Sequence, residues 1–445
     1  MVSEKTRRSQ RLDATPAVDL LELVVNDVKN SSPVPRSRDQ QLQQSVEDKT
    51  IIFQGIKTKT APVAQTKVIF LDGARGLAAM LVVIQHADEF MPNLHLGSVG
   101  VDIFFVLSSF LLTWLFMLKS MKLLSKGAHV RTWAFTLADY FQKRFLRVYP
   151  MFFVTVILLS FLSVDDQRRY YIGKRPPFDL VKTLTFSYEY RYHVFWSLPL
   201  EITYYFLIPI FVLAVLSLRR FWWIPALLLT VWIVHEGVFG ERQSHAPMRP
   251  HISTFLTGSL AATVYVKADM WIKKTKFVFR CRHIILVRAI EGLTILMLLS
   301  VCFRGLLFNW IHQNPAPRPI GFPYTSAFLA IILVIEVINP SCVASMLEWN
   351  VLRYWGKISF SIYLLHSFVV YHPKLSQQAN YFDRFFSRLV IILAISTAAY
   401  YLVEYPSLLL AQKVSRLIAN AEKRFSVDYT ELAETEVLRR KMASR

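Results

Sequence analysis

Apolar runs of about 20 residues recur from residue 68 to residue 410, and they limit the possible folds more than any other feature. A run of this length can cross a bilayer as an α-helix, and only helices or closed barrels pair every backbone group there. The chain is also 53% hydrophobic. We therefore expect an all-α, polytopic transmembrane bundle of about ten spans. They cover residues 68–90, 97–118, 144–164, 196–218, 221–238, 251–266, 284–303, 323–340, 354–372 and 388–410.

The placement of the basic residues explains the formal net charge of +20. With this number of spans, both tails and the two strongly basic connections, residues 119–144 and 267–288, fall on one side. The positive-inside rule identifies that side as the cytosol. Both termini are therefore expected in the cytosol, although the 165–195 connection on the opposite side is also basic.

Composition also bounds the partners. The sequence has no Lys/Arg-rich stripe with interleaved aromatic residues, so nucleic acid is not expected as a partner. Cys281, Cys302 and Cys342 have neither metal-ligand nor disulfide spacing, and no metal is expected. The expected partner is the lipid bilayer, in an endomembrane or the plasma membrane. The oligomeric state is left open.

Three regions follow from this pattern. Residues 1–66 are polar and basic and predict a disordered tail, residues 67–411 form the transmembrane domain, and residues 412–445 form a mixed-charge cytosolic tail. The polar N-terminus shows no cleavable signal peptide, so the first span is expected to act as the insertion signal. The aromatic-rich 165–195 connection indicates an interfacial anchor or, alternatively, part of an acceptor site.

The first predicted span, VIFLDGARGLAAMLVVIQHADEF, carries Asp72, Arg75 and His86 among apolar residues. Charged residues inside a bilayer are costly and are therefore functional candidates. Arg75 and His86 are separated by three helical turns plus about 20°, so they share one face about 16 Å apart, and Asp72 can pair with Arg75. The alternative is a buried Asp–Arg pair and a histidine that only bonds a neighbouring helix. Three aligned polar groups favour a lined cavity.

Other predicted spans add polar residues. If successive spans alternate in direction, Glu201 and His366 reach the same outer half of the membrane as His86. Arg144 and Arg147 open the third span at the cytosolic face, where they share a helix face and suit phosphate, because planar guanidinium groups bind it bidentately. Interhelical hydrogen bonds and positive-inside flanking are the alternative explanations. Together the residues suit a long phosphorylated donor whose reactive end reaches a histidine able to accept a hydroxyl proton.

Six strings occur in one order across this region: FLDGARGLAAMLVVIQH, GVDIFFVLSSFLL, RFLRVYP, WSLPLEITYYFLIP, GKISFSIYLLH and VEYP. With them the chain resembles the acyltransferase-3 family of polytopic membrane acyltransferases. The long N-terminal tail resembles that of fungal members.

The resemblance implies transfer of an acyl group, above all acetyl, from acyl-CoA to a hydroxyl on a sugar or other glycan, a lipid or a small metabolite, including those of secondary metabolism. The family's Arg-x10-His pattern falls on Arg75 and His86. Its Arg-x-x-Arg pattern, associated with the donor's phosphates, falls on Arg144 and Arg147, and its glutamate falls on Glu201. No esterase-like domain is recognised beside the membrane domain, which is expected to carry the reaction.

The expected roles follow from these positions. Arg75 helps to position acetyl-CoA, and His86 acts as general base, by direct transfer or through an acyl-histidine. Glu201 orients His86 or the acceptor. A transporter or a non-catalytic membrane receptor is the competing interpretation, because intramembrane charges also mark substrate paths. The sequence shows neither an inverted repeat nor matching broken spans, which argues against a transporter.

Overall fold

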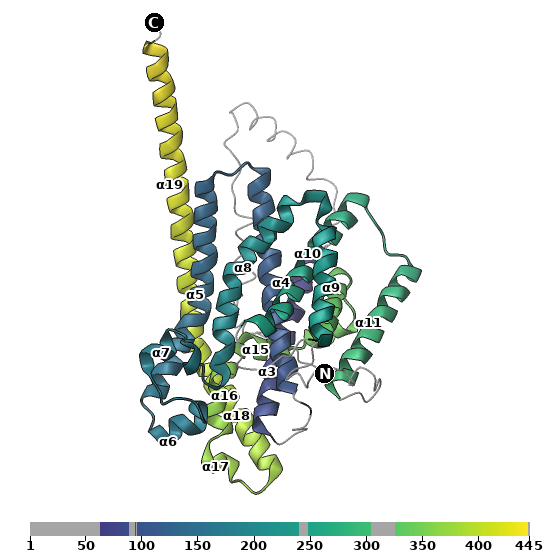
Figure 1. The fold of residues 1–445 in the computed structure, drawn as a ribbon, viewed down its shortest axis with the longest axis vertical. Coiled ribbons are helices and arrows are strands. Elements are labelled where there is room, and N and C mark those ends of the chain that lie inside the picture. The colour runs from purple at the N-terminus through teal and green to yellow at the C-terminus, as the bar shows by residue number, and fades with distance from the viewer. Residues whose placement is uncertain (1–62, 89–93, 95, 240–247, 304–324, 444–445) are drawn as a thin grey trace, which may run out of the picture. The chain divides into compact units, whose positions relative to one another are not determined.

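The computed structural model describes residues 63–88, 94, 96–239, 248–303 and 325–443 (Figure 1). These residues belong to one compact unit, Pro62–Arg445. Across them the chain forms helices joined by turns, without any β-strand, so the predicted all-α fold is confirmed. The predicted disordered tail lies outside the described residues as far as residue 62.

The long helices follow the predicted spans in order. They are α3 (Val63–Ala87), α4 (Leu96–Ser125), α5 (Val130–Ser160), α8 (Ser197–Ser217), α9 (Trp223–Phe239), α10 (Ile252–Thr275), α11 (Cys281–Cys302), α13 (Thr325–Ile338), α18 (Tyr381–Ala399) and α19 (Tyr405–Ala443). Shorter helices are α14 (Cys342–Leu347) and α17 (Pro373–Ser376), with the 3₁₀ turns η6 (Arg219–Phe221) and η7 (Arg249–His251).

Helices long and apolar enough to cross a membrane number 5 among the described residues. They comprise Ile69–Ala87, Leu96–Ser125, His193–Ser217, Cys281–Cys302 and the continuous stretch Tyr381–Arg424. Several of these helices, and α9 beside them, expose large apolar side chains such as Ile210, Leu227 and Ile285. Such a surface suits lipid rather than water. The chain is therefore a multi-pass membrane protein, while ten spans and cytosolic termini stay predictions.

The ninth predicted span, residues 354–372, differs from the expected single helix. It consists of α15 (Asn350–Lys357) and α16 (Ser359–Val370), with a break at Ile358. The 12 residues of α16 extend only about 18 Å, less than the roughly 30 Å hydrocarbon core. A helix broken at membrane depth is tolerated where it is buried in protein, and Ile358 and Ile362 are fully buried.

Glycine contacts between α3 and α15 explain this packing. A Cβ atom at Gly76 would lie 2.1 Å from the backbone oxygen of Leu352, and one at Gly356 would lie 1.8 Å from that of Asp72. Both distances are far inside van der Waals contact, so only glycine allows the two backbones to approach so closely. The Gly-Ala-Arg-Gly segment therefore docks the first helix onto the broken one.

The predicted 165–195 connection is compactly folded. It contains α6 (Val164–Gln167), the π-helical turn η3 (Arg168–Ile172), α7 (Leu180–Leu184) and the 3₁₀ turns η4 (Tyr188–Tyr190) and η5 (His193–Trp196). Tyr188 is exposed, but Tyr171 and Tyr192 are buried inside the protein. Tyr171 donates a hydrogen bond to the carbonyl of Leu364 in α16. Tyr171 and Tyr192 are therefore packed inside the protein and do not act as the interfacial anchor that the sequence indicates.

The C-terminal helices run on from one another. A π-helical turn, η8 (Tyr400–Glu404), joins α18 to α19. The predicted domain boundary at residues 411 and 412 falls inside α19, which packs along α5 (Figure 1). The π-helical turn inserts an extra residue into the helix, a feature frequent at functional sites.

Candidate active site

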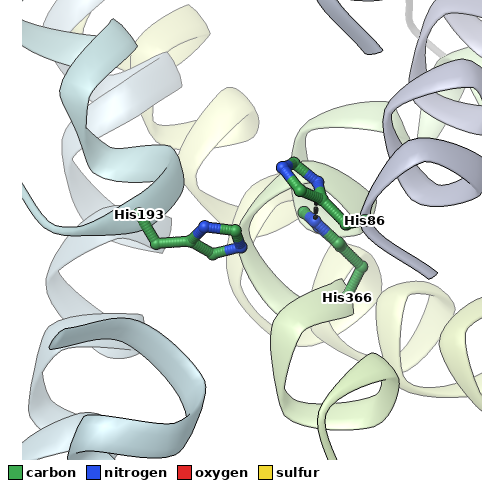
Figure 2. A group of neighbouring side chains, drawn as sticks. All are labelled: His86, His193 and His366. Carbon is green, nitrogen blue, oxygen red and sulfur yellow. Dashed lines mark hydrogen bonds between the residues drawn. The ribbon is translucent and has the colours of Figure 1, made fainter. Parts of the chain in front are cut away.

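His86 lies in the last turn of α3 and faces α16. Its Nδ1 atom is 3.0 Å from Nε2 of His366, the distance of a hydrogen bond, and the two rings are stacked with centroids 5.0 Å apart (Figure 2). The sequence predicted similar depths for these two histidines from the directions of their spans. The structure brings them into direct contact.

His366 is held firmly within α16. It is completely buried, and its Nδ1 atom lies 3.0 Å from the carbonyl oxygen of Ile362, one turn earlier. Ile362 packs in an apolar cluster with Ala79 and Val83 of α3. The apolar contact between the two helices therefore fixes the separation of the two imidazoles.

A third histidine, His193, adjoins this pair and was not identified from the sequence. Its ring centroid is 4.6 Å from that of His86 and 5.9 Å from that of His366 (Figure 2). The backbone of His193 is left-handed, with φ of 35°, a conformation that is rare for residues other than glycine and costs energy. Its position just before the fourth predicted span, at the same end as His86, was the one signal available.

The three histidines could in principle hold a metal, because one ligand atom from each lies within 4.8 Å of the others. Neutral imidazoles suit zinc. Tetrahedral zinc with bonds of about 2.05 Å holds its ligand nitrogens about 3.3 Å apart. The nitrogens of His86 and His366 are 3.0 Å apart, which matches a hydrogen bond with a proton between them. The arrangement as it stands therefore fits a hydrogen-bonded pair.

Arg75 lies further back along α3. Its Nη1 atom forms the predicted ion pair with Asp72 Oδ1, at 3.2 Å. Arg75 also interacts electrostatically with Glu201 of α8, as do Arg144 and Arg147 of α5. The structure thus gathers the three predicted arginines, which come from two helices, around the predicted glutamate.

Glu201 is bound away from the histidines. Its Oε1 atom accepts a hydrogen bond of 2.7 Å from the hydroxyl of Tyr205, one turn later in α8. Tyr363 lies between the two groups of residues: it interacts electrostatically with Glu201, and its ring centroid is 6.4 Å from that of His366. The Tyr363 hydroxyl is held 2.7 Å from the Ser197 hydroxyl. Tyr363 of α16 therefore interacts with a member of each group.

Arg144 has a donor available for a ligand. Its Nε atom is buried and makes no hydrogen bond with any described residue. Its charge interacts with Tyr205, Tyr140 and Glu201. A buried polar group without a partner costs free energy, so a bound hydrogen-bond acceptor would stabilise this arrangement.

Glu404, in the VEYP string, adds a partner for Arg147 that the sequence left without a role. The Arg147 Nη1 and Glu404 Oε1 atoms are 3.8 Å apart, and Glu404 Oε2 accepts a 3.2 Å hydrogen bond from Ser361. Glu404 ends the π-helical turn η8, and its side chain faces Arg147 of α5. The glutamate orients the guanidinium without forming a short hydrogen bond to it.

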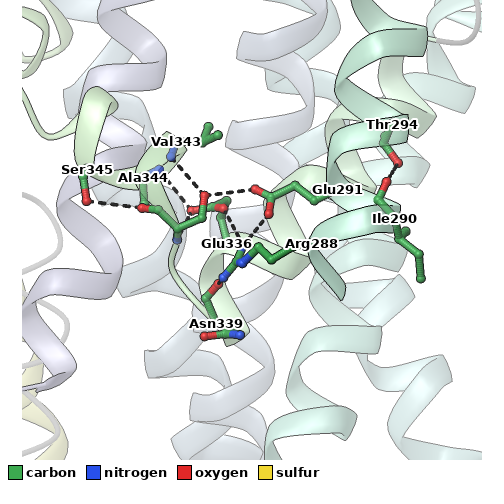
Figure 3. Close-up of polar contacts among 10 residues, drawn as sticks. Arg288, Ile290, Glu291, Thr294, Glu336, Asn339, Val343, Ala344 and Ser345 are labelled. Carbon is green, nitrogen blue, oxygen red and sulfur yellow. Dashed lines mark hydrogen bonds and ion pairs between the residues drawn. The ribbon is translucent and has the colours of Figure 1, made fainter. Parts of the chain in front are cut away.

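A second polar cluster lies between α11, α13 and α14 (Figure 3). Arg288 donates to Glu291 and to the carbonyl of Asn339, and lies 3.3 Å from Glu336. Glu336 also accepts the backbone N–H groups of Ser341 and Ala344, at 2.9 and 3.0 Å. The cluster caps α14 and ties α11 to α13.

Comparison with known proteins places these residues in context. The acyltransferase domain of the acyltransferase-3 family matches residues 68–405. O-acetyltransferase OatA of Staphylococcus aureus (strain NCTC 8325 / PS 47) is 24% identical over 320 residues, 66% of this chain and 49% of that protein. Putative O-acetyltransferase SACOL0978 of Staphylococcus aureus (strain COL) is 25% identical over 330 residues, 67% of this chain and 50% of that protein.

The chain thus spans about half the length of these curated relatives. Among solved structures, none matches it. These relatives are bacterial, so the fungal likeness of the N-terminal tail stays a prediction.

Proposed function

The chain belongs to the acyltransferase-3 family, so residues 68–405 form an acyltransferase domain, and we propose that it is a membrane O-acyltransferase. The donor is acyl-CoA, in its simplest form acetyl-CoA, and the acceptor is a hydroxyl group. The observation that carries the proposal is the pairing of His86 with His366 beside the three arginines around Glu201. One group can move a proton and the other can bind an anion.

The arginine group binds the donor's phosphates. Guanidinium forks bind phosphate bidentately, and the buried Nε of Arg144 supplies a donor that the described residues leave unmatched. The ion pair with Glu404 holds the Arg147 guanidinium in place. Arg75, on the same helix as His86, positions the donor so that its thioester reaches the histidines.

The histidine group performs the proton transfer. The acceptor hydroxyl gives its proton to His86 as its oxygen forms a bond to the acyl carbonyl carbon. The C–S bond then breaks, and the leaving CoA thiolate takes the proton from the His86 imidazolium. No proton or electron is left over. Glu201, bound to Tyr205 and the arginines, serves the donor side rather than His86.

The acceptor is a hydroxyl of a small metabolite, a glycan or a lipid. The names of the relatives, which are O-acetyltransferases, support acetyl as the acyl group. The proposed acceptors include the small metabolites of secondary metabolism. The buried tyrosines of residues 165–195 lie beside His193, where they border the acceptor's approach: the rings of Tyr171 and His193 have centroids 5.9 Å apart.

The donor site is tested by ligand stabilisation. The detergent-purified protein is heated with acetyl-CoA, with free CoA, and without ligand. A ligand at about 100 times its dissociation constant stabilises by about 2.7 kcal/mol. We expect stabilisation by both ligands, and its loss in the double variant Arg144→Gln and Arg147→Gln.

The matched control is Arg219→Gln with Arg220→Gln, an exposed pair in η6 outside the site. It should keep the stabilisation. If neither acetyl-CoA nor CoA stabilises the wild-type protein, the CoA donor is wrong. Solute flux in liposomes would then support the transporter interpretation.

A further inference from the structure

We propose that His366 is a positioning residue that sets the tautomer of His86, so that Nε2 of His86 is the atom that accepts the hydroxyl proton. The use of this proton rests on the proposed function. The tautomer itself rests only on the geometry of the two rings.

The backbone of α16 decides which nitrogen of His366 carries the hydrogen. A carbonyl oxygen can only accept hydrogen bonds. Since Nδ1 of His366 lies 3.0 Å from the carbonyl oxygen of Ile362, Nδ1 must carry the hydrogen. This carbonyl has two lone pairs, so it can serve the helix and the imidazole together.

The tautomer of His366 in turn decides the tautomer of His86. A neutral imidazole has one N–H and one lone pair. With its hydrogen on Nδ1, His366 presents a lone pair at Nε2. The Nδ1 atom of His86, 3.0 Å away, must then donate, which leaves the lone pair of His86 on Nε2. The opposite arrangement needs a charged His366, and burying a charge at this fully buried residue is costly.

Packing around the two rings holds them in this orientation. The apolar cluster of Ala79, Val83, Ile358 and Ile362 packs α3 against α15 and α16 beneath the two rings. His193 lies against the edge of the His86 ring, with a left-handed backbone that the surrounding structure maintains. The direction in which His86 presents its basic nitrogen is therefore decided by packing.

The chemical consequence resembles that of the orienting group of a hydrolase triad, with a neutral histidine in place of a carboxylate. When His86 accepts a proton at Nε2, its Nδ1–H becomes a charge-assisted donor to His366. The hydrogen bond therefore strengthens in the transition state. Removing the acceptor at residue 366 should lower kcat more than it changes KM.

Two variants distinguish the role of residue 366 as a hydrogen-bond acceptor from the space that its side chain fills. In His366→Gln the side-chain amide oxygen can take the place of Nε2 as acceptor, whereas His366→Phe fills the space without one. Labelled acetyl-CoA is supplied with an extract of metabolites, glycans and lipids from the expressing cells, and acetyl incorporation is measured. We expect kcat to fall about 100-fold or more in the Phe variant and less than about 10-fold in the Gln variant. The KM for acetyl-CoA should be unchanged in both.

The tautomer is read directly by NMR of the full chain in detergent with ¹⁵N-labelled histidine. The chain has 11 histidines, and the signals of His86 are assigned by their loss in His86→Gln. We expect a protonated Nδ1 in wild type and His366→Gln, and a mixture in His366→Phe. His235→Gln, at an exposed position on α9, is the matched control and should change neither rate nor tautomer.

The outcomes separate the two proposals. A proton on Nε2 of His86 in wild type, or full activity of His366→Phe, overturns the role of His366. If His86→Ala remains active, the proposed base is wrong, while the NMR result still decides the tautomer. If the Phe variant does not fold, the wild-type and Gln spectra carry the test.

Discussion

The Arg288 cluster and the histidine cluster both lie among apolar helices, and they are built differently. The Arg288 cluster is closed: its carboxylates receive hydrogen bonds from a guanidinium, a hydroxyl and two backbone N–H groups, and they join neighbouring helices (Figure 3). The histidine cluster is assembled from α3, α16 and η5, and includes a residue with a left-handed backbone (Figure 2). An intramembrane charge by itself therefore does not identify a catalytic group. The pattern of hydrogen-bond donors and acceptors around it separates a structural cluster from a candidate site.

The largest effect is expected from His86→Ala, which removes the proposed general base from the histidine cluster. Loss of a general base typically lowers the rate about 10²- to 10⁴-fold, while the removal of one partly exposed ring should leave stability nearly unchanged. Acetyl transfer and thermal unfolding of the same preparation measure both. His235→Ala, on α9, is the control. An unaltered transfer rate would remove His86 from the mechanism.

Arg288→Met should have the opposite pattern, with stability lost and turnover retained. It leaves Glu291 and Glu336 together without their cation, and breaking a buried ion pair costs about 3 kcal/mol or more. We expect a large fall in thermal stability with acetyl-CoA stabilisation and turnover retained per folded molecule. Loss of turnover in folded Arg288→Met protein would show that the two clusters are not separate.

The glycine contact gives an intermediate effect. In Gly76→Ala the new Cβ would meet the Leu352 carbonyl oxygen at 2.1 Å, so α3 and α15 must separate, at a cost of about 1–3 kcal/mol. Because α3 carries both Arg75 and His86, turnover should fall together with stability. Gly292→Ala on α11, where a Cβ meets nothing within 4 Å, is the matched control and should be neutral or slightly stabilising. Equal melting temperatures for the two variants would contradict this packing.

The smallest effect is expected at Asp139, which lies in α5 before the predicted third span. Burial raises the pKa of its carboxyl, but Lys143, Lys119 and the Ser415 hydroxyl together bring it below the ordinary value of 3.8. The stability that Asp139 adds is therefore present above that value and lost as pH falls through the lower folded pKa. Asp139→Asn should destabilise by about 1–2 kcal/mol at neutral pH.

The measurement is thermal unfolding from pH 7 down to pH 3. The gap between wild type and Asp139→Asn should narrow at the acidic end. The charge of Glu422 also interacts with Asp139: burial raises the pKa of Glu422, while Lys119 lowers it. The same scan in Glu422→Gln controls for its contribution. A gap that is constant with pH would exclude the proposed ion pairs as its cause.

Much of the fold and part of the site could be predicted from local sequence. Apolar length predicts helices at α3, α4, α8 and α11, because crossing a bilayer demands about 20 apolar residues. Spacing along one helix predicts the Asp72–Arg75 pair, since residues three apart are neighbours. Hydropathy did not reveal the break at Ile358, because it measures the length of an apolar run and not the path of the backbone. Gly356, two residues before the break, lies against the backbone of α3, a contact that hydropathy does not register.

The residues that are chemically able to act, namely a histidine, a glutamate and three arginines within apolar helices, could be identified from the sequence. Their partners on other helices depend on the tertiary structure. The fold pairs His86 with His366 and adds His193 from the 165–195 connection. It also places Glu404, at the end of a π-helical turn, against Arg147. The physical reason is that periodicity fixes neighbours within one helix, whereas contacts between helices depend on close packing over the whole interface.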